Sequence, residues 1–145
     1  MRSIYLRTIL QQTVSDGYGD LVTRRTGAAV RGGVEQALAQ LGGAEPAVID
    51  FSAVRCLDFS CADEIVAKLV LQYGGRRFIF RGLSPAQREA LEPVLEHHGL
   101  AVVTEDGTGG LALLGPETHA ARLLAELREH RLVAGGEDGH QAPLA

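Results

Sequence analysis

The sequence lacks any apolar run near the roughly 20 residues of a membrane-spanning helix, and it lacks the charged, apolar and small-residue pattern of a signal peptide. We therefore expect a cytoplasmic protein that does not associate with membranes. It is also short of positive charge: its net charge is −4, which disfavours non-specific binding to nucleic acid. The only cysteines, Cys56 and Cys61, have no further ligands at zinc-site spacing. We accordingly predict no metal and no cofactor.

What the sequence does have is the size and composition of one globular domain. Its 145 residues are 46% hydrophobic, enough to bury about two thirds of the unfolded surface. We assign residues 1–133 to a single domain with a core at 20–105 and a C-terminal hairpin and helix at 100–131. Residues 134–145 show no apolar pattern and are predicted to form a disordered tail.

Alternating apolar patterns predict the order of the elements. Apolar or β-branched runs predict strands, and these lie at residues 3–10, 20–23, 47–51, 76–80, 100–103 and 111–114. Apolar residues at helical spacing predict helices at residues 27–41, 60–72, 84–98 and 117–131. Strands that alternate with helices indicate an α/β fold, here a mixed sheet of five to six strands packed against about four helices.

The stretch from Ala47 to Lys68 is the centre of this pattern, because a buried strand leads there into a helix. Ser60, followed three residues later by Asp63, is typical of a capping box, so we expect Ser60 to cap the helix. Phe59, in the turn before it, is expected to fill the core or, if it is exposed, to act as an apolar anchor for a partner. The acidic side chains of Asp63 and Glu64 would complement the positive end of the helix dipole.

The motif Asp50-Phe51-Ser52-x-Val54, followed by Asp58 and by Ser60-x-Ala62-Asp63-Glu64, resembles the STAS domain of bacterial anti-sigma factor antagonists. The detail is most similar to a branch of uncharacterised STAS-like bacterial proteins. Gly82-Leu83-Ser84-Pro85 and Gly99-Leu100 fall where STAS domains place their next helix and its end. The resemblance covers roughly residues 21 to 105 and implies a small regulatory binding module rather than an enzyme.

The resemblance also implies a site and a partner. It implies a protein partner, an anti-sigma factor or a histidine-kinase-like protein, bound by Asp58, Phe59, Ser60, Asp63 and Glu64. In STAS antagonists a kinase phosphorylates the serine that directly follows the aspartate of this turn. Here Phe59 follows Asp58 and Ser60 comes one residue later, so Ser60 is interpreted first as a cap and second as a phosphosite. Three neighbouring carboxylates would oppose a phosphate there.

Two other functions stay open. The hairpin and helix of residues 100–130 faintly resemble the wing of a nucleic-acid-linked transcriptional regulator. A small enzyme could use Cys61 or the acidic cluster, although no catalytic set is placed by a motif and we name no catalytic residue. An N-terminal strand at a sheet edge could also pair between two copies of the chain.

Overall fold

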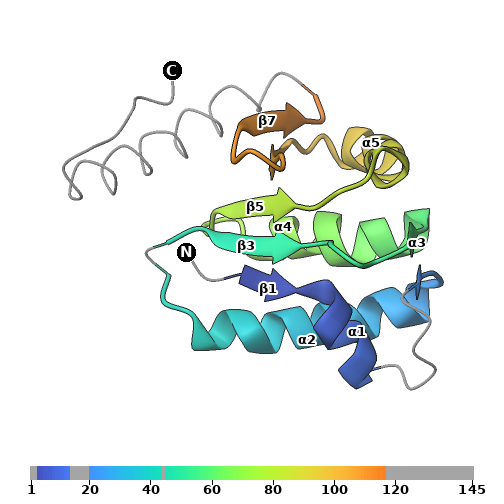
Figure 1. Cartoon of the computed structure of the whole chain (residues 1–145), viewed down its shortest axis with the longest axis vertical. Coiled ribbons are helices and arrows are strands. Elements are labelled where there is room, and N and C mark those ends of the chain that lie inside the picture. Colours follow the sequence, from blue (N-terminus) through green and yellow to red (C-terminus); the bar gives the residue numbers. More distant parts are fainter. Residues whose placement is uncertain (1–2, 14–19, 44, 117–145) are drawn as a thin grey trace.

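The computed structural model describes residues 3–13, 20–43 and 45–116, in which strands alternate with helices (Figure 1). The strands are β1 (Ser3–Tyr5), β2 (Asp20–Leu21), β3 (Ala47–Asp50), β4 (Cys56–Leu57), β5 (Phe78–Arg81), β6 (Val102–Glu105) and β7 (Leu111–Leu114). The helices are α1 (Leu6–Thr13), α2 (Arg24–Gln40), α3 (Phe59–Ala62), the π-helical turn η1 (Asp63–Ala67), α4 (Lys68–Gln72) and α5 (Pro85–His98). Because α3, η1 and α4 are continuous, the described chain has four helical segments.

Five of the strands form one mixed sheet in the order β1-β3-β5-β6-β7. The first four strands are parallel, because each helical connection returns the chain to the end of the sheet at which the previous strand began. Strand β7 is antiparallel to β6. Strands β2 and β4 pair separately, in parallel. The α/β class predicted from the sequence, with five to six strands and about four helices, is confirmed.

One face of the sheet carries the main hydrophobic core. Successive side chains on a strand point to opposite faces, so Ile49 on β3 and Phe80 on β5 share the side on which the helices pack. Val34 from α2, Ile65 from η1 and Leu91 from α5 meet them there, and all five residues are fully buried. The helical spacing of the apolar residues in the sequence therefore places α2, η1 and α5 against this one face.

The beginning and the end of α5 are those that the sequence predicts. The Ser84 hydroxyl accepts a hydrogen bond from the Gln87 N–H at 3.1 Å, and the Gln87 side chain accepts one from the Ser84 N–H at 2.9 Å. Pro85 is the first helical residue, and Gly99 ends the helix with a left-handed φ of 63°. The buried Gln87 amide also donates to the Val54 carbonyl at 2.9 Å, which ties α5 to the loop that precedes β4.

The prediction of a strand over residues 3–10 is wrong beyond Tyr5. Residues Leu6–Thr13 form α1, with Leu6, Ile9 and Leu10 buried. Their spacing of three and four residues is that of one helix face, and it outweighs the loose alternation of the sequence. The short strand that remains, β1, is the edge of the sheet next to β3.

Other predictions fall on the ends of the chain. The helix at residues 117–131 and the tail at 134–145 lie outside the described residues. The hairpin at residues 100–114 is confirmed, with Val103 opposite Leu113. Among the residues that the structure describes, no helix is both long enough and apolar enough to cross a membrane.

Candidate functional site

The Asp58 carboxylate joins the beginnings of two helices. One oxygen accepts a hydrogen bond from the Cys61 N–H at 2.8 Å and so caps α3, and the other accepts one from the Thr23 N–H at 2.7 Å, at the start of α2. The short sheet of β2 and β4 brings these ends together, because Leu21 pairs with Leu57 and each strand leads directly into its helix. Both carboxylate oxygens of Asp58 therefore have hydrogen-bond partners within the chain, and they stabilise the fold.

Asp58 is ionised in this position. Burial alone would raise its pKa, but the hydrogen bonds from the Cys61 and Thr23 N–H groups and the charge of Arg24 outweigh burial, so the pKa lies below the usual value for aspartate. The negative charge also lies at the positive end of α3.

The expectation that Ser60 caps this helix is wrong, because Asp58 is the cap and Ser60 is the second helical residue. Aspartate and serine are equally good N-caps, so composition alone could not choose between Asp58 and Ser60. The choice falls on Asp58 because its second oxygen has a partner across the fold in Thr23. The partly exposed Ser60 hydroxyl is thereby released from a capping role.

Helices α2 and α3 cross very closely beside this cap. A Cβ atom on Gly27 would lie 2.9 Å from the Cα atom of Cys61, so only glycine fits there without a shift. The Cys61 thiol donates to the Thr23 carbonyl at 3.1 Å. Burial, together with the nearby Asp58 charge, raises the pKa of Cys61 to about 12, so the thiol stays protonated at neutral pH and is a poor nucleophile.

Asp63 connects three helical segments. It accepts from the Arg24 guanidinium of α2 at 2.7 Å and contacts the Nε2 atom of His98, at the end of α5, at 2.6 Å. Burial alone would raise the pKa of Asp63, but these two contacts outweigh burial and lower it. Although Asp63 belongs to the predicted site, its carboxylate already has two partners within the chain.

Glu64 is buried, and its side chain is only 4% exposed. Its carboxylate lies 2.8 Å from the Lys68 ammonium, 3.7 Å from Arg24 and 3.9 Å from Arg31. It is the second residue of the π-helical turn η1, a rare local widening of the helix. Glu64 is therefore a buried carboxylate that is paired with partly exposed cations, and it offers little surface to a partner.

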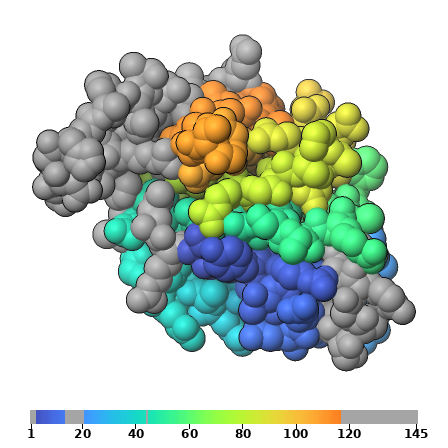
Figure 2. Space-filling model, viewed as in Figure 1, coloured from blue at the N-terminus to red at the C-terminus, as the bar shows by residue number. Residues whose placement is uncertain are grey.

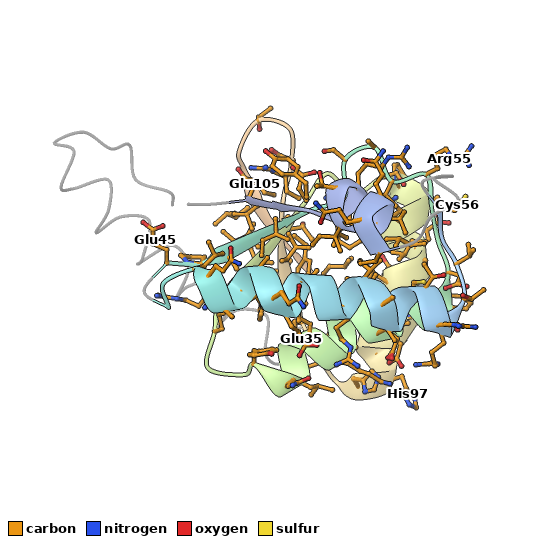
Figure 3. The ribbon with its side chains drawn as sticks, turned by 90° about the horizontal axis from the view of Figure 1, so that it is seen from below. Glu35, Glu45, Arg55, Cys56, His97 and Glu105 are labelled. Carbon is orange, nitrogen blue, oxygen red and sulfur yellow. The ribbon has the colours of Figure 1, made fainter. Side chains whose placement is uncertain are left out.

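Phe59 differs from its neighbours, because 61% of its surface is exposed and the expectation that it fills the core is wrong. It lines a groove of about 330 Å³ between α3 and the end of α5. The lining residues include both polar and apolar side chains, namely Arg24, Phe59, Ser60, Asp63, Pro93, Val94, His97 and His98. Figure 3 shows His97 at the outer side of α5.

The structure thus brings Phe59, Ser60 and Asp63 together in one groove, whereas Asp58 binds backbone N–H groups and Glu64 is buried. Sequence reasoning missed the contributions of Arg24, Val94 and His98. From the sequence alone, Arg24 is assigned to a solvent-exposed face, and His98 is assigned to the surface of its helix. The packing of α2 against α3 brings Arg24 to Phe59, and the packing of α5 against α3 brings Val94 and His98 there.

A second polar cluster lies on the sheet face opposite the main core. Asp50, only 3% exposed, accepts from the Arg81 guanidinium at 2.7 Å and from the Ser52 N–H at 2.7 Å. Arg81 also donates to the Ser3 hydroxyl at 2.8 Å and lies over the Tyr5 ring. Since Asp50 and Arg81 satisfy one another across adjacent strands, this cluster fixes the carboxyl ends of β1, β3 and β5.

In the part of the chain that the structure describes, no group of three histidine, cysteine, aspartate or glutamate side chains is arranged to hold a metal ion. Cys56 is exposed at the edge of the molecule, in the segment before α3 (Figure 3), and is separate from the buried Cys61. Comparison with protein-family models, curated proteins and solved structures finds no match to this chain.

Proposed function

We propose that this chain is a non-catalytic protein-interaction module of a bacterial regulatory system, similar to the anti-sigma factor antagonists. Its partner is an anti-sigma factor or a histidine-kinase-like protein in the cytoplasm, and it docks on the groove between α3 and α5. The resemblance of residues 50–64 to the STAS motif supports the class of function. The groove between α3 and α5 supports this part of the surface as the docking site.

The exposure of Phe59 is the observation that carries this proposal. Large aromatic side chains stabilise a fold when they are buried, yet Phe59 is 61% exposed at the first position of a helix whose cap is fully occupied. Pro93 and Val94 add apolar surface on the opposite wall, and Arg24 supplies a charge at the rim. An aromatic anchor in a groove with a charged rim is typical of the residues that dominate protein interfaces.

The surroundings of Ser60 bear on phosphorylation, the second interpretation of this residue. Of the three carboxylates expected to repel a phosphate, Asp58 faces backbone N–H groups, Asp63 is paired with Arg24 and His98, and Glu64 is buried beside Lys68. A phosphate on Ser60 would enter a groove that Arg24 also lines. This arrangement reduces the electrostatic repulsion that a phosphate on Ser60 would meet, and so it supports a role for Ser60 phosphorylation as a switch.

The test uses four baits in a pull-down from the source organism: the wild type, Phe59→Ser, Leu71→Ser and Ser60→Asp. Leu71 on α4 is the matched control, because it is 52% exposed and does not line the groove. We expect a partner that the wild type and Leu71→Ser retain and that Phe59→Ser loses. Loss with Ser60→Asp as well would support the switch.

Retention of the partner by Phe59→Ser, with the fold intact by circular dichroism, would exclude the groove as the docking site. Equal loss with Phe59→Ser and Leu71→Ser would point to a general effect on the fold. Asp63→Arg is a poorer test, because it would break the contacts of Asp63 with Arg24 and His98 as well as any contact with a partner.

A further inference from the structure

The groove between α3 and α5 combines apolar and cationic side chains. Phe59 lines it from α3, and Pro93 and Val94 line it from α5. Arg24, at the beginning of α2, and His97, near the end of α5, also line it, and both are exposed. Figure 2 shows the yellow surface of α5 next to the green surface of the chain that leads into α3. The groove therefore offers apolar surface beside groups that donate hydrogen bonds to an acid.

The charged side chains that a partner would meet first in this groove are cationic. The Arg24 side chain is 53% exposed, whereas those of Asp63 and Glu64 are 18% and 4% exposed. Arg24 contacts both of these carboxylates through the same atom, Nη1. The Nε and Nη2 donors of its guanidinium are not used in these contacts, and two such donors suit a further carboxylate. Although the net charge of the chain is −4, this part of its surface is suited to an acidic partner.

The apolar and cationic parts of the groove lie about one helical turn apart. Phe59 and Asp63 are four residues apart on one continuous helical segment, which puts their Cβ atoms about 5–6 Å from each other. The Arg24 guanidinium is held 2.7 Å from the Asp63 carboxylate, so its distance from Phe59 is set by the same turn. On a second helix, two side chains three or four residues apart have this separation.

The backbone around the groove favours a helical occupant. Every residue that lines the groove belongs to α2, α3, η1 or α5, so these residues present no strand edge to which an extended peptide could add. An extended segment would leave backbone N–H and C=O groups unpaired against the apolar side chains. A helix satisfies these groups internally and presents only its side chains.

We propose that the groove binds a helical segment of the partner protein that carries a large apolar side chain and, three or four residues away, an aspartate or a glutamate. The apolar side chain packs between Phe59 and Val94, and the carboxylate accepts hydrogen bonds from Arg24, with His97 beside it. This inference rests on the docking site proposed above and adds to it the chemistry of the partner.

A peptide selection on the full chain tests the proposal. Random peptides of about 16 residues, long enough for several helical turns, are displayed on phage and selected on the immobilised wild type after depletion on Phe59→Ser. The enriched peptides are synthesised and titrated by fluorescence anisotropy against the wild type, Phe59→Ser, Arg24→Gln and Arg25→Gln. Arg25 is the matched control, because it follows Arg24, is also exposed and does not line the groove.

We expect the enriched peptides to carry an acid three or four residues from a large apolar residue. Phe59→Ser should weaken their binding by at least about thirtyfold, as the loss of a central aromatic anchor does. Arg24→Gln should weaken it by about fivefold and Arg25→Gln by less than about twofold. Glutamine in place of the peptide's acid should weaken binding to the wild type about fivefold and have little further effect on Arg24→Gln.

Two kinds of failure are distinguishable. Peptides that require Phe59 but lack an acid, or that bind Arg24→Gln as tightly as the wild type, would overturn the proposal and leave the groove as the docking site. Peptides that bind Phe59→Ser as tightly as the wild type, or a selection that enriches no peptide, would overturn the docking site and the proposal together.

A change in the peptide decides the point if Arg24→Gln does not fold. The peptide with glutamine in place of its acid leaves the protein unaltered, and so does raising the NaCl concentration from about 50 mM to about 500 mM, which screens an exposed ion pair. Both changes should weaken binding severalfold. An affinity that neither change alters would overturn the proposal.

Discussion

The beginnings of α3 and α5 solve the same problem in different ways. Both must satisfy the free N–H groups of a helix start. In α5 the Ser84 hydroxyl accepts a hydrogen bond from the Gln87 N–H, and the Gln87 side-chain amide oxygen accepts one from the Ser84 N–H, so all partners lie within four residues. In α3 the Asp58 carboxylate caps its own helix and, 35 residues back in the chain, also binds the Thr23 N–H of α2. The start of α5 is a local structure, and the start of α3 is a tertiary one.

This difference has a functional consequence. Because Asp58 carries the capping of α3 and the link to α2, the next two residues, Phe59 and Ser60, are not needed to form the helix start. Phe59 can therefore remain exposed and Ser60 partly exposed at the groove. At the start of α5, by contrast, Ser84 is used by the cap itself. A helix start that is stabilised from a distance leaves its first side chains available for binding.

Removing each cap is the strongest way to test this comparison. Asp58→Ala removes an acceptor of two backbone hydrogen bonds and should lower the free energy of unfolding by about 2–4 kcal/mol. Ser84→Ala removes one local acceptor and should lower it by about 1 kcal/mol. Urea denaturation of both variants measures the two values. Equal losses would contradict the view that Asp58 stabilises two helices.

A smaller effect is expected where α2 crosses the start of α3. Gly27→Ala would press a methyl group against the Cys61 backbone and should cost about 1–2 kcal/mol, after the gain in helix propensity of about 1 kcal/mol. Gly32→Ala on the same helix is the control, because nothing lies within 4 Å of its Cβ position, and it should stabilise by up to about 1 kcal/mol. Thermal unfolding compares the two. A stabilising Gly27→Ala would show that the crossing is looser than the structure indicates.

The two caps should also differ in their dependence on pH. The pKa of Asp58 is lowered in the folded state, so its contribution to stability is present above the unfolded value of about 3.9 and is lost as pH falls through the folded value. The stability difference between wild type and Asp58→Asn should therefore narrow as the pH falls below about 4. The difference between wild type and Ser84→Ala should stay constant over the same range, because no acid is changed.

Urea titrations at several pH values between 7 and 3 measure both differences. An Asp58→Asn difference that does not change with pH would mean that the carboxylate charge contributes nothing to the cap.

How far the fold could be predicted follows the same division between local and tertiary structure. Ser84, Pro85 and Gly99 are local signals, and they place α5 correctly. Strands β3 and β5 through β7 fall within one or two residues of their predicted bounds, because buried apolar runs specify them. Residues 6–10 were mistaken for a strand, since a short apolar segment fits either period until its burial is known.

The site was less predictable, because it depends on contacts between residues far apart in the chain. The turn of Asp58, Phe59 and Ser60 could be found from the strand-to-helix pattern. That Asp58 bonds to Thr23 and that Asp63 meets His98 could not, since sequence separations of 35 residues carry no local pattern. The roles of Ser60 as a cap and Phe59 as a core residue were accordingly assigned wrongly.

The smallest effect on stability is expected at Phe59, and it separates binding from folding. Because Phe59 is 61% exposed, Phe59→Ser should change the free energy of unfolding by no more than about 0.5 kcal/mol, the usual range for surface substitutions. Phe51, which is fully buried, is the contrast: Phe51→Ala should cost about 3–5 kcal/mol. Urea denaturation of both variants decides the point. A loss above 1 kcal/mol for Phe59→Ser would mean that the fold itself uses this ring, and loss of a partner by that variant would no longer identify a docking residue. With stability unchanged, an exposed ring that the fold does not require remains an anchor available to a partner.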